Sequence, residues 1–208
     1  MPRYDLAVFD FDGTLADSAE WFFGSLNEVA ERFGFRTTTD DERQALRGLD
    51  NREIIRRLQV PAWRLPAIAR HMRRRAAETI DSIRLFGGVP EALAALRENG
   101  TRLAIVSSNS EQNVRRIIGG ELADRIAFYG CGASLFGKAS KLRSAIRHCS
   151  ADRERTIYVG DETRDIEAAR AARTASGAVL WGYAAPEALL ALDPTVVFHD
   201  VARLGQLT

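Results

Sequence analysis

The chain has 208 residues, of which 46% are hydrophobic and 27% charged, a size and composition that suit one core domain with a modest insertion. Its 29 basic residues nearly balance 28 acidic ones, so the net charge provides no general attraction for nucleic acid, and we expect no nucleic-acid partner. The two cysteines are far apart, no basic start leads into a long apolar segment, and no apolar run reaches roughly 18 residues, so we expect a cytoplasmic protein without disulfides, structural zinc or a membrane anchor.

Short apolar runs that end abruptly in small or acidic residues predict buried strands. In chain order these runs are residues 6–9, 103–106, 156–160, 178–181 and 196–198. Helical patterns at residues 90–98, 113–118, 141–148 and 163–173 separate them. This alternation predicts an α/β fold with a Rossmann-like, doubly wound and mostly parallel sheet.

Residues 16–84 interrupt the alternation, because this segment is long, lacks a convincing strand and shows successive helical patterns with arginines on their outer faces. We expect it to form a helical cap inserted after the first strand, with residues 1–15 and 85–208 forming the core. Asp17, three residues before Glu20, is expected to cap the first helix of the insertion.

Polar side chains directly follow three of the predicted strands, namely Asp10, Ser107 and Asp161. In an open parallel sheet ligands bind beyond the carboxyl ends of the strands, so we expect these side chains to converge there. Asp12 should join them, because residues two apart in an extended chain point to the same side. Crowded carboxylates require a cation or shift their pKa values upward, and a set of oxygen ligands favours Mg²⁺ over zinc.

The segment Asp10-Phe11-Asp12-Gly13-Thr14-Leu15 after a strand resembles the signature of the haloacid dehalogenase-like hydrolase superfamily, especially its phosphoglycolate phosphatase-like branch. The resemblance covers essentially the whole chain, although the predicted cap is similar only in general character. Ser107, in Ile105-Val106-Ser107-Ser108-Asn109, is similar to the Ser or Thr with which the family holds the transferring phosphoryl group. Gly160-Asp161 followed by Asp165 resembles the family's acidic metal-binding motif.

Lys138 is similar to the lysine with which the family neutralises the phosphoryl group. The family's lysine is often followed by Pro, whereas Ala139 follows Lys138 here, so Lys141 stays a competitor for the role. Gly137 favours Lys138, because a glycine lets the backbone turn toward the expected site.

The resemblance implies a phosphatase that uses Mg²⁺ and an aspartyl-phosphate intermediate. Asp10 would be the nucleophile and Asp12 the general acid and base, and both would bind the metal together with Asp161. The remaining implied phosphate-binding residues are Thr14, Ser107, Ser108, Asn109 and Lys138. Thr14 could instead serve only the turn, and Asp165 could either support the metal site or stabilise the first turn of its helix.

Arg47 and Arg52 flank a turn that resembles the substrate-facing loop of the family's caps. We expect one or both to contact an anionic leaving group, the alternative being a solvated helix face.

The expected partner is a small phosphorylated metabolite, either phosphoglycolate-like or a sugar phosphate, hydrolysed by a monomer or homodimer. Two alternatives stay open, a phosphomutase of the same fold and a catalytically silent protein that binds a phosphorylated ligand. Asp12 favours catalysis, because a protein that only binds its ligand has no use for a proton carrier.

Overall fold

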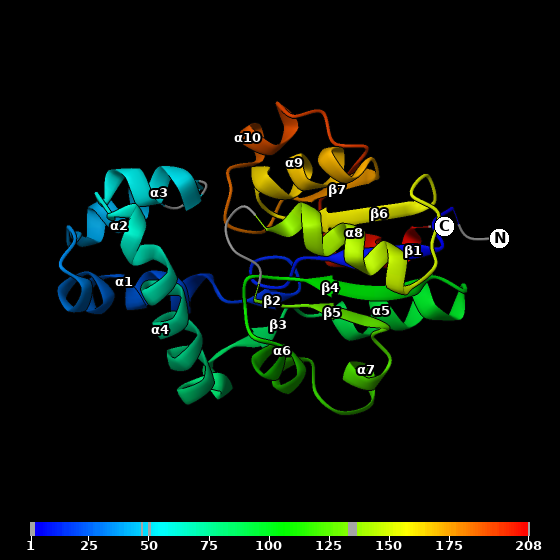
Figure 1. Ribbon diagram of the computed structural model, residues 1–208, viewed down its shortest axis with the longest axis horizontal. Coiled ribbons are helices and arrows are strands. Elements are labelled where there is room, and N and C mark those ends of the chain that lie inside the picture. Colours follow the sequence, from blue (N-terminus) through cyan, green and yellow to red (C-terminus); the bar gives the residue numbers. More distant parts are fainter. Residues whose placement is uncertain (1–2, 47, 50, 133–136, 208) are drawn as a thin grey trace.

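The computed structural model describes residues 3–46, 48–49, 51–132 and 137–207, and its centre is a six-stranded parallel sheet (Figure 1). The strand order is β5-β4-β1-β6-β7-β8. In chain order the strands of this sheet are β1 (Leu6–Phe9), β4 (Arg102–Val106), β5 (Phe128–Gly130), β6 (Thr156–Gly160), β7 (Ala175–Val179) and β8 (Val196–Phe198). The predicted α/β class with a doubly wound parallel sheet is confirmed.

Helices cover both faces of this sheet. One face packs against α5 (Val89–Glu98), α6 (Glu111–Ile118), α7 (Gly120–Asp124) and the short helix η3 (Val201–Gln206). The other face packs against α8 (Lys138–His148) and α9 (Thr163–Ala172), with α10 (Pro186–Leu190) beside α9.

Strand β1 shows why the central strands are apolar without interruption. Ala7 and Phe9 belong to the hydrophobic cluster on the α5 face, whereas Leu6 and Val8 belong to the cluster on the α8 face. Successive side chains of a strand point to opposite faces, and both faces are covered, so every position must be apolar. The same buried register aligns Phe9 with Ile105 of β4 and with Val159 of β6, and the three strands therefore end at one edge.

The residues between β1 and α5 form mostly helices that lie to one side of the sheet in Figure 1. They are α1 (Ala19–Phe33), α2 (Asp40–Leu46), α3 (Asn51–Arg57), the short helix η1 (Ala62–Arg64), α4 (Leu65–Glu78) and the short helix η2 (Ile80–Ser82). This helical segment has an apolar cluster of its own, formed by Phe23, Leu26, Leu46, Ile54 and Leu58. Among the helices of the described ranges, none is long and apolar enough to cross a membrane.

Two short strands at the ends of this segment correct the prediction that residues 16–84 contain no strand. β2 (Ala16–Asp17) pairs antiparallel with β3 (Arg84–Leu85) where the chain leaves and re-enters the core. The predicted helix cap at Asp17 is also wrong, since Asp17 lies opposite Arg84 and helix α1 starts after Ser18. The local pattern misled because strand pairing between residues far apart in sequence overrides a capping preference.

Several element boundaries also differ from the predictions. β7 occupies residues 175–179 rather than 178–181, and β5 was not predicted. Both strands contain a glycine that is needed because a neighbouring aromatic ring packs against it. A Cβ on Gly177 would lie 2.9 Å from the ring of Phe198, and one on Gly130 would lie 3.0 Å from the ring of Phe128. Close packing against bulky residues, rather than a local apolar run, fixes these strands.

Candidate active site

Three side chains lie at the edge where β1, β4 and β6 end. Asp10 follows β1, Ser107 follows β4, and Asp161 follows β6. They are 3%, 0% and 0% exposed, respectively. The parallel register therefore brings together three positions that are more than fifty residues apart, as the strand-end argument predicts.

The loop after β1 is a tight turn around one carbonyl group. The backbone N–H groups of Thr14, Leu15 and Ala16 all donate to the carbonyl oxygen of Phe11, while the Phe11 ring is fully buried. Gly13 adopts φ 77°, a left-handed conformation that favours glycine. This turn directs Asp10 and Asp12 toward the same edge.

Lys138 contacts Asp10 directly. It is the first residue of α8 and is only 2% exposed, and its Nζ donates hydrogen bonds to Oδ2 of Asp10 and, at 2.5 Å, to Oδ1 of Asp165. Lys141 lies one helical turn further on, beside Gly130 of β5. Of the two lysines, the structure thus brings Lys138 to the nucleophile candidate.

The charge on these groups is set by burial and by their neighbours. Burial raises the pKa of Asp10 to about 7, against the lowering effect of Lys138. Burial lowers the pKa of Lys138, but the carboxylates around it, Asp10 and Asp165 foremost, more than compensate and the net shift is upward. Lys138 is therefore held as a cation, and additional positive charge at this place would favour the ionised form of Asp10.

Asp161 is held against the loop after β1. Its Oδ1 accepts a hydrogen bond of 2.7 Å from the hydroxyl of Thr14, and its Oδ2 accepts one of 2.9 Å from the backbone N–H of Tyr183. A Cβ on Gly13 would lie only 2.3 Å from this carboxylate. Thr14 therefore connects the first loop to the loop after β6.

Asp12 has a partner from the loop after β4. The side-chain amide of Asn109 donates to both carboxylate oxygens of Asp12, at 3.3 and 3.1 Å. The Ser107 hydroxyl in turn accepts from the backbone N–H of Asn109 at 3.1 Å. Burial raises the pKa of Asp12, although the hydrogen bonds from Asn109 and Ser18 lower it.

Two residues that the sequence analysis did not select also lie in the site, Glu162 and Arg164. Glu162 is buried, and its side chain accepts a hydrogen bond from Nε of Arg164. The Nη1 atom of Arg164 is buried and has no hydrogen-bond partner among the described residues. Adjacency to Asp161 could have pointed to Glu162, whereas nothing in the local pattern singles out Arg164.

A divalent cation fits the donor set of this edge. One carboxylate oxygen from each of Asp10, Glu162 and Asp165 can be chosen so that all three lie within 4.8 Å of one another. The wider carboxylate cluster consists of Asp10, Asp12, Asp161, Glu162 and Asp165. Lys138 and Arg164 are cations that lower the pKa values of both Asp10 and Asp12. An all-oxygen set with excess negative charge suits Mg²⁺ better than zinc.

This grouping differs from the predicted ligand set of Asp10, Asp12 and Asp161. In the described structure the oxygens of Asp161 accept from Thr14 and Tyr183, and those of Asp12 accept from Asn109. Asp165 has both kinds of contact considered from the sequence. Its Oδ1 accepts from Lys138 and, at 3.1 Å, from the Tyr158 hydroxyl, whereas its Oδ2 accepts at 3.1 Å from the backbone N–H of Glu162, the capping contact at the start of α9.

The predicted residues of the helical segment lie differently. Arg52, on α3, donates to Glu167 of α9 at 2.9 and 3.3 Å, so its guanidinium is directed at a core helix in this conformation. Arg47 lies outside the described residues. The carbonyl of Ser108 accepts from Arg73 of α4 at 3.2 Å, a second contact between the helical segment and the core.

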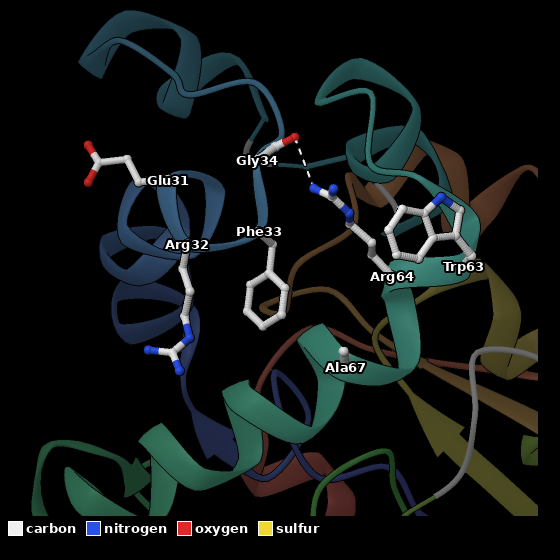
Figure 2. Close-up of a pocket in the computed structure, with 7 residues that line it drawn as sticks. All are labelled: Glu31, Arg32, Phe33, Gly34, Trp63, Arg64 and Ala67. Atoms are coloured by element: carbon white, nitrogen blue, oxygen red, sulfur yellow. Dashed lines mark hydrogen bonds between the residues drawn. The ribbon is translucent and has the colours of Figure 1, made fainter.

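A surface pocket of about 490 Å³ lies within the helical segment and away from the carboxylate cluster (Figure 2). Its lining is Glu31, Arg32, Phe33, Gly34, Trp63, Arg64 and Ala67. Arg64 lies 4.6 Å from the centre of the Trp63 ring and donates to the carbonyl of Gly34 at 3.3 Å. None of the predicted site residues contributes to this pocket, so it is no part of the candidate active site.

A doubly wound sheet with acidic side chains at the ends of β1 and β6, and a lysine beside the first of them, indicates an α/β protein that binds its ligand at the carboxyl ends of its strands. The model of the haloacid dehalogenase-like hydrolase family matches residues 7–179. A phosphoglycolate phosphatase of Synechococcus elongatus is 32% identical over 200 residues, which cover 96% of this chain and 94% of that protein. The chain belongs to the haloacid dehalogenase-like hydrolase family, and the resemblance inferred from its motifs is confirmed.

Solved structures share the fold at lower identity. A protein of Lactobacillus plantarum superposes with a TM-score of 0.82 at 20% identity, with 99% of each chain covered. CbbY of Rhodobacter sphaeroides, solved in complex with phosphate, superposes with a TM-score of 0.74 at 22% identity, covering 97% of this chain and 96% of that one.

Proposed function

We propose that this protein is a Mg²⁺-dependent phosphatase that hydrolyses a small phosphorylated metabolite through an aspartyl-phosphate on Asp10. The observation that supports it best is the buried contact between Lys138 and Asp10 at the rim shared with Ser107 and Asp161. Family membership and the phosphatase relatives support the class of enzyme, a phosphoric monoester hydrolase.

The proposed chemistry assigns one task to each group. Asp10 attacks phosphorus, the bond to the leaving oxygen breaks, and Asp12 donates a proton to that oxygen. Asp12 then takes a proton from the water that hydrolyses the aspartyl-phosphate. Lys138 and the Ser107 hydroxyl meet the negative charge on the phosphoryl oxygens.

Mg²⁺ would be held by carboxylates of the cluster and would supply positive charge that favours both phosphate binding and ionised Asp10. Asp10, Glu162 and Asp165 have the closest grouping, and Asp12 and Asp161 stay in the proposed set from the sequence. The buried excess of carboxylates supports the need for such an ion.

For the substrate we propose a phosphoglycolate-like metabolite first and a sugar phosphate second, since several relatives bear the name phosphoglycolate phosphatase. We further propose that residues 16–84 act as a cap that must open to admit substrate. Asp10 and Lys138 are almost fully buried, and the helical segment contacts the core through Arg52 and Arg73, which supports a closed arrangement. A cytoplasmic location and a monomeric or homodimeric state stay predictions.

Asp10→Asn tests the proposal. The amide keeps the shape of the side chain but is a far poorer nucleophile, so we expect the hydrolysis of an aryl phosphate and of phosphoglycolate to fall on the order of 10³-fold or more. Steady-state rates and a thermal unfolding curve would be measured together. Asp5→Asn is the matched control, because Asp5 precedes the opposite end of β1 and pairs with Arg155 at 2.7 Å. Turnover by a folded Asp10→Asn variant at the rate of the Asp5→Asn control would refute the assignment.

Experiments on the wild-type protein distinguish the proposed phosphatase from the two alternatives, a phosphomutase and a silent binding protein. A phosphomutase would convert a sugar phosphate to its isomer rather than release phosphate. A silent binding protein would fail to form an acyl-phosphate mimic on Asp10 with beryllofluoride and Mg²⁺, because only a competent nucleophile forms it.

A further inference from the structure

A chain of side-chain hydrogen bonds runs from helix α4 to Asp12. Asn113 lies in the first turn of α6 and is 1% exposed. Its side-chain amide nitrogen donates to the carbonyl oxygen of Arg73 on α4 at 2.9 Å and to Oδ1 of Asn109 at 3.0 Å. The Nδ2 atom of Asn109 then donates to Asp12.

The direction of these bonds fixes the orientation of the Asn109 amide. Its Oδ1 accepts from Asn113 and, at 2.9 Å, from the backbone N–H of Ser110, so its NH₂ group must point away from α6 and toward Asp12. An amide has a donor end and an acceptor end, and two donors on the acceptor end exclude the flipped orientation. Asn113 and the Ser110 N–H together hold Asn109 in the orientation that presents a donor to Asp12.

The same chain depends on where α4 lies. Figure 1 shows α4 of the helical segment beside α6 of the core, and the two helices are in contact. Arg73 provides two links, its carbonyl to Asn113 and its guanidinium to the carbonyl of Ser108 in the loop after β4. When α4 is displaced, Asn113 loses one of its two acceptors, and its amide becomes free to turn away from Asn109.

We propose that Asn113 is a positioning residue that couples the docking of α4 to the orientation of Asn109 and, through it, of Asp12. The inference rests on the proposed function, in which Asp12 transfers protons to and from the reacting oxygens. Asn113 itself touches no reacting atom. Proton transfer through Asp12 is thus efficient only while the helical segment is docked, which limits reaction to the closed enzyme.

Asn113→Leu tests the inference, because leucine branches at Cγ as asparagine does and has no hydrogen-bond donor, although its two methyl groups are bulkier than the amide. We expect kcat to fall about 10- to 100-fold with KM changed by less than about 3-fold, since general acid–base catalysis is typically worth 10²–10⁴-fold and only its orientation is impaired. In an Asn109→Ala background, Asn113→Leu should lower kcat no further, because the route through Asn109 is already removed.

Arg116→Ala is the matched control. Arg116 is also on α6 and donates at 3.4 Å to the carbonyl of Ala77 on α4, but it has no bond to Asn109. We expect its kcat to stay within about 2-fold of the wild type. Unfolding curves of all variants would accompany the kinetics, and Asn113→Ala, which leaves room for water, is the second variant if leucine disturbs folding.

The inference is overturned if kcat is unchanged in folded Asn113→Leu, if only KM rises, or if the effects of Asn113→Leu and Asn109→Ala multiply as independent losses. It is also overturned if neither Asn113 variant folds while Arg116→Ala does, since the residue would then be purely structural. An inactive wild-type enzyme refutes the proposed function, and this inference with it, whereas an active wild type with an unaffected Asn113→Leu variant refutes the inference alone.

Discussion

Glycines beside the carboxylate cluster leave no space for a side chain. A Cβ on Gly182 would lie 2.1 Å from Cβ of Asp161, and one on Gly160 would lie 2.4 Å from the carboxyl carbon of Asp165. Gly24, in the exposed part of α1, has no neighbouring atom within 4 Å of such a Cβ. The first two glycines therefore let acidic side chains approach the backbone, and the third has no comparable task.

These positions predict opposite effects of the same substitution. Gly182→Ala should displace Asp161, lower kcat at least about 10-fold and reduce the free energy of unfolding by roughly 1–3 kcal/mol, the typical cost of overpacking. Gly24→Ala should raise that free energy by about 0.5–1 kcal/mol and leave kcat unchanged, because alanine favours the helix. Urea unfolding and initial hydrolysis rates check both, and a fully active Gly182→Ala variant would contradict the packing argument.

Separate elements hold the helical segment against the core. The carbonyl of Gly48 accepts from the backbone N–H of Ala185 at 2.6 Å, and Arg52 of α3 pairs with Glu167 of α9. Tyr183 packs edge-on against Phe22 of α1, with ring centres 5.6 Å apart, and shares a 2.8 Å hydrogen bond with Ser18. The loop after β7 thus contacts both the carboxylate cluster and the helical segment.

The Arg52–Glu167 pair allows the two interpretations of Arg52 to be separated. If the pair only holds α3 to α9, the Arg52→Ala and Glu167→Ala variants should resemble each other. Each should change kcat and KM by no more than about 3-fold, because half-exposed ion pairs contribute little to stability. If Arg52 leaves Glu167 to bind an anionic leaving group, Arg52→Ala alone should raise KM, by about 10-fold. Kinetics of both variants with phosphoglycolate and with an uncharged aryl leaving group would decide, and equal effects would remove Arg52 from the substrate site.

The fold buries more negative than positive charge at the end of its sheet. Burial raises the pKa of Asp10 from 3.8 to about 7 and raises that of Asp161 well above its usual value. A carboxyl group with a raised pKa binds more protons folded than unfolded, so its contribution to stability is complete below about pH 3.8 and is lost as the pH rises through about 7. Bound Mg²⁺ opposes this loss, because it favours the ionised carboxylates.

We therefore expect the metal-free protein to have a lower Tm at pH 8 than at pH 6, and Mg²⁺ to raise Tm more at pH 8. At a concentration 100 times Kd, the ion would stabilise the fold by about 2.7 kcal/mol. Thermal unfolding with EDTA or with Mg²⁺ at both pH values measures the effect. Glu162→Gln should reduce the response to Mg²⁺, and Asp5→Asn, outside the cluster, should preserve it; an identical response of all three proteins would contradict a metal site at this place.

The class of fold and the first acidic loop follow from local sequence patterns alone. Buried strands of a doubly wound sheet are apolar at every position, so β1, β4 and β6 are recognisable from local runs, and the residues that end them are recognisable as well. The turn from Asp10 to Leu15 is equally local, because its hydrogen bonds and the left-handed Gly13 lie within six residues. The division at residues 16 and 84 between cap and core stays a prediction.

Which groups meet across the site depends on long-range packing that local patterns do not encode. The contact of Lys138 rather than Lys141 with Asp10 spans 128 residues, and the bonds from Asn109 to Asp12 span 97. Glu162, Arg164 and Asn113 are ordinary helix-start residues until the packing of α9 and α6 gives them buried partners. Periodicity and turn chemistry encode neighbours along the chain, whereas these contacts depend on strand register and helix docking, which arise when the apolar faces of distant segments pack together.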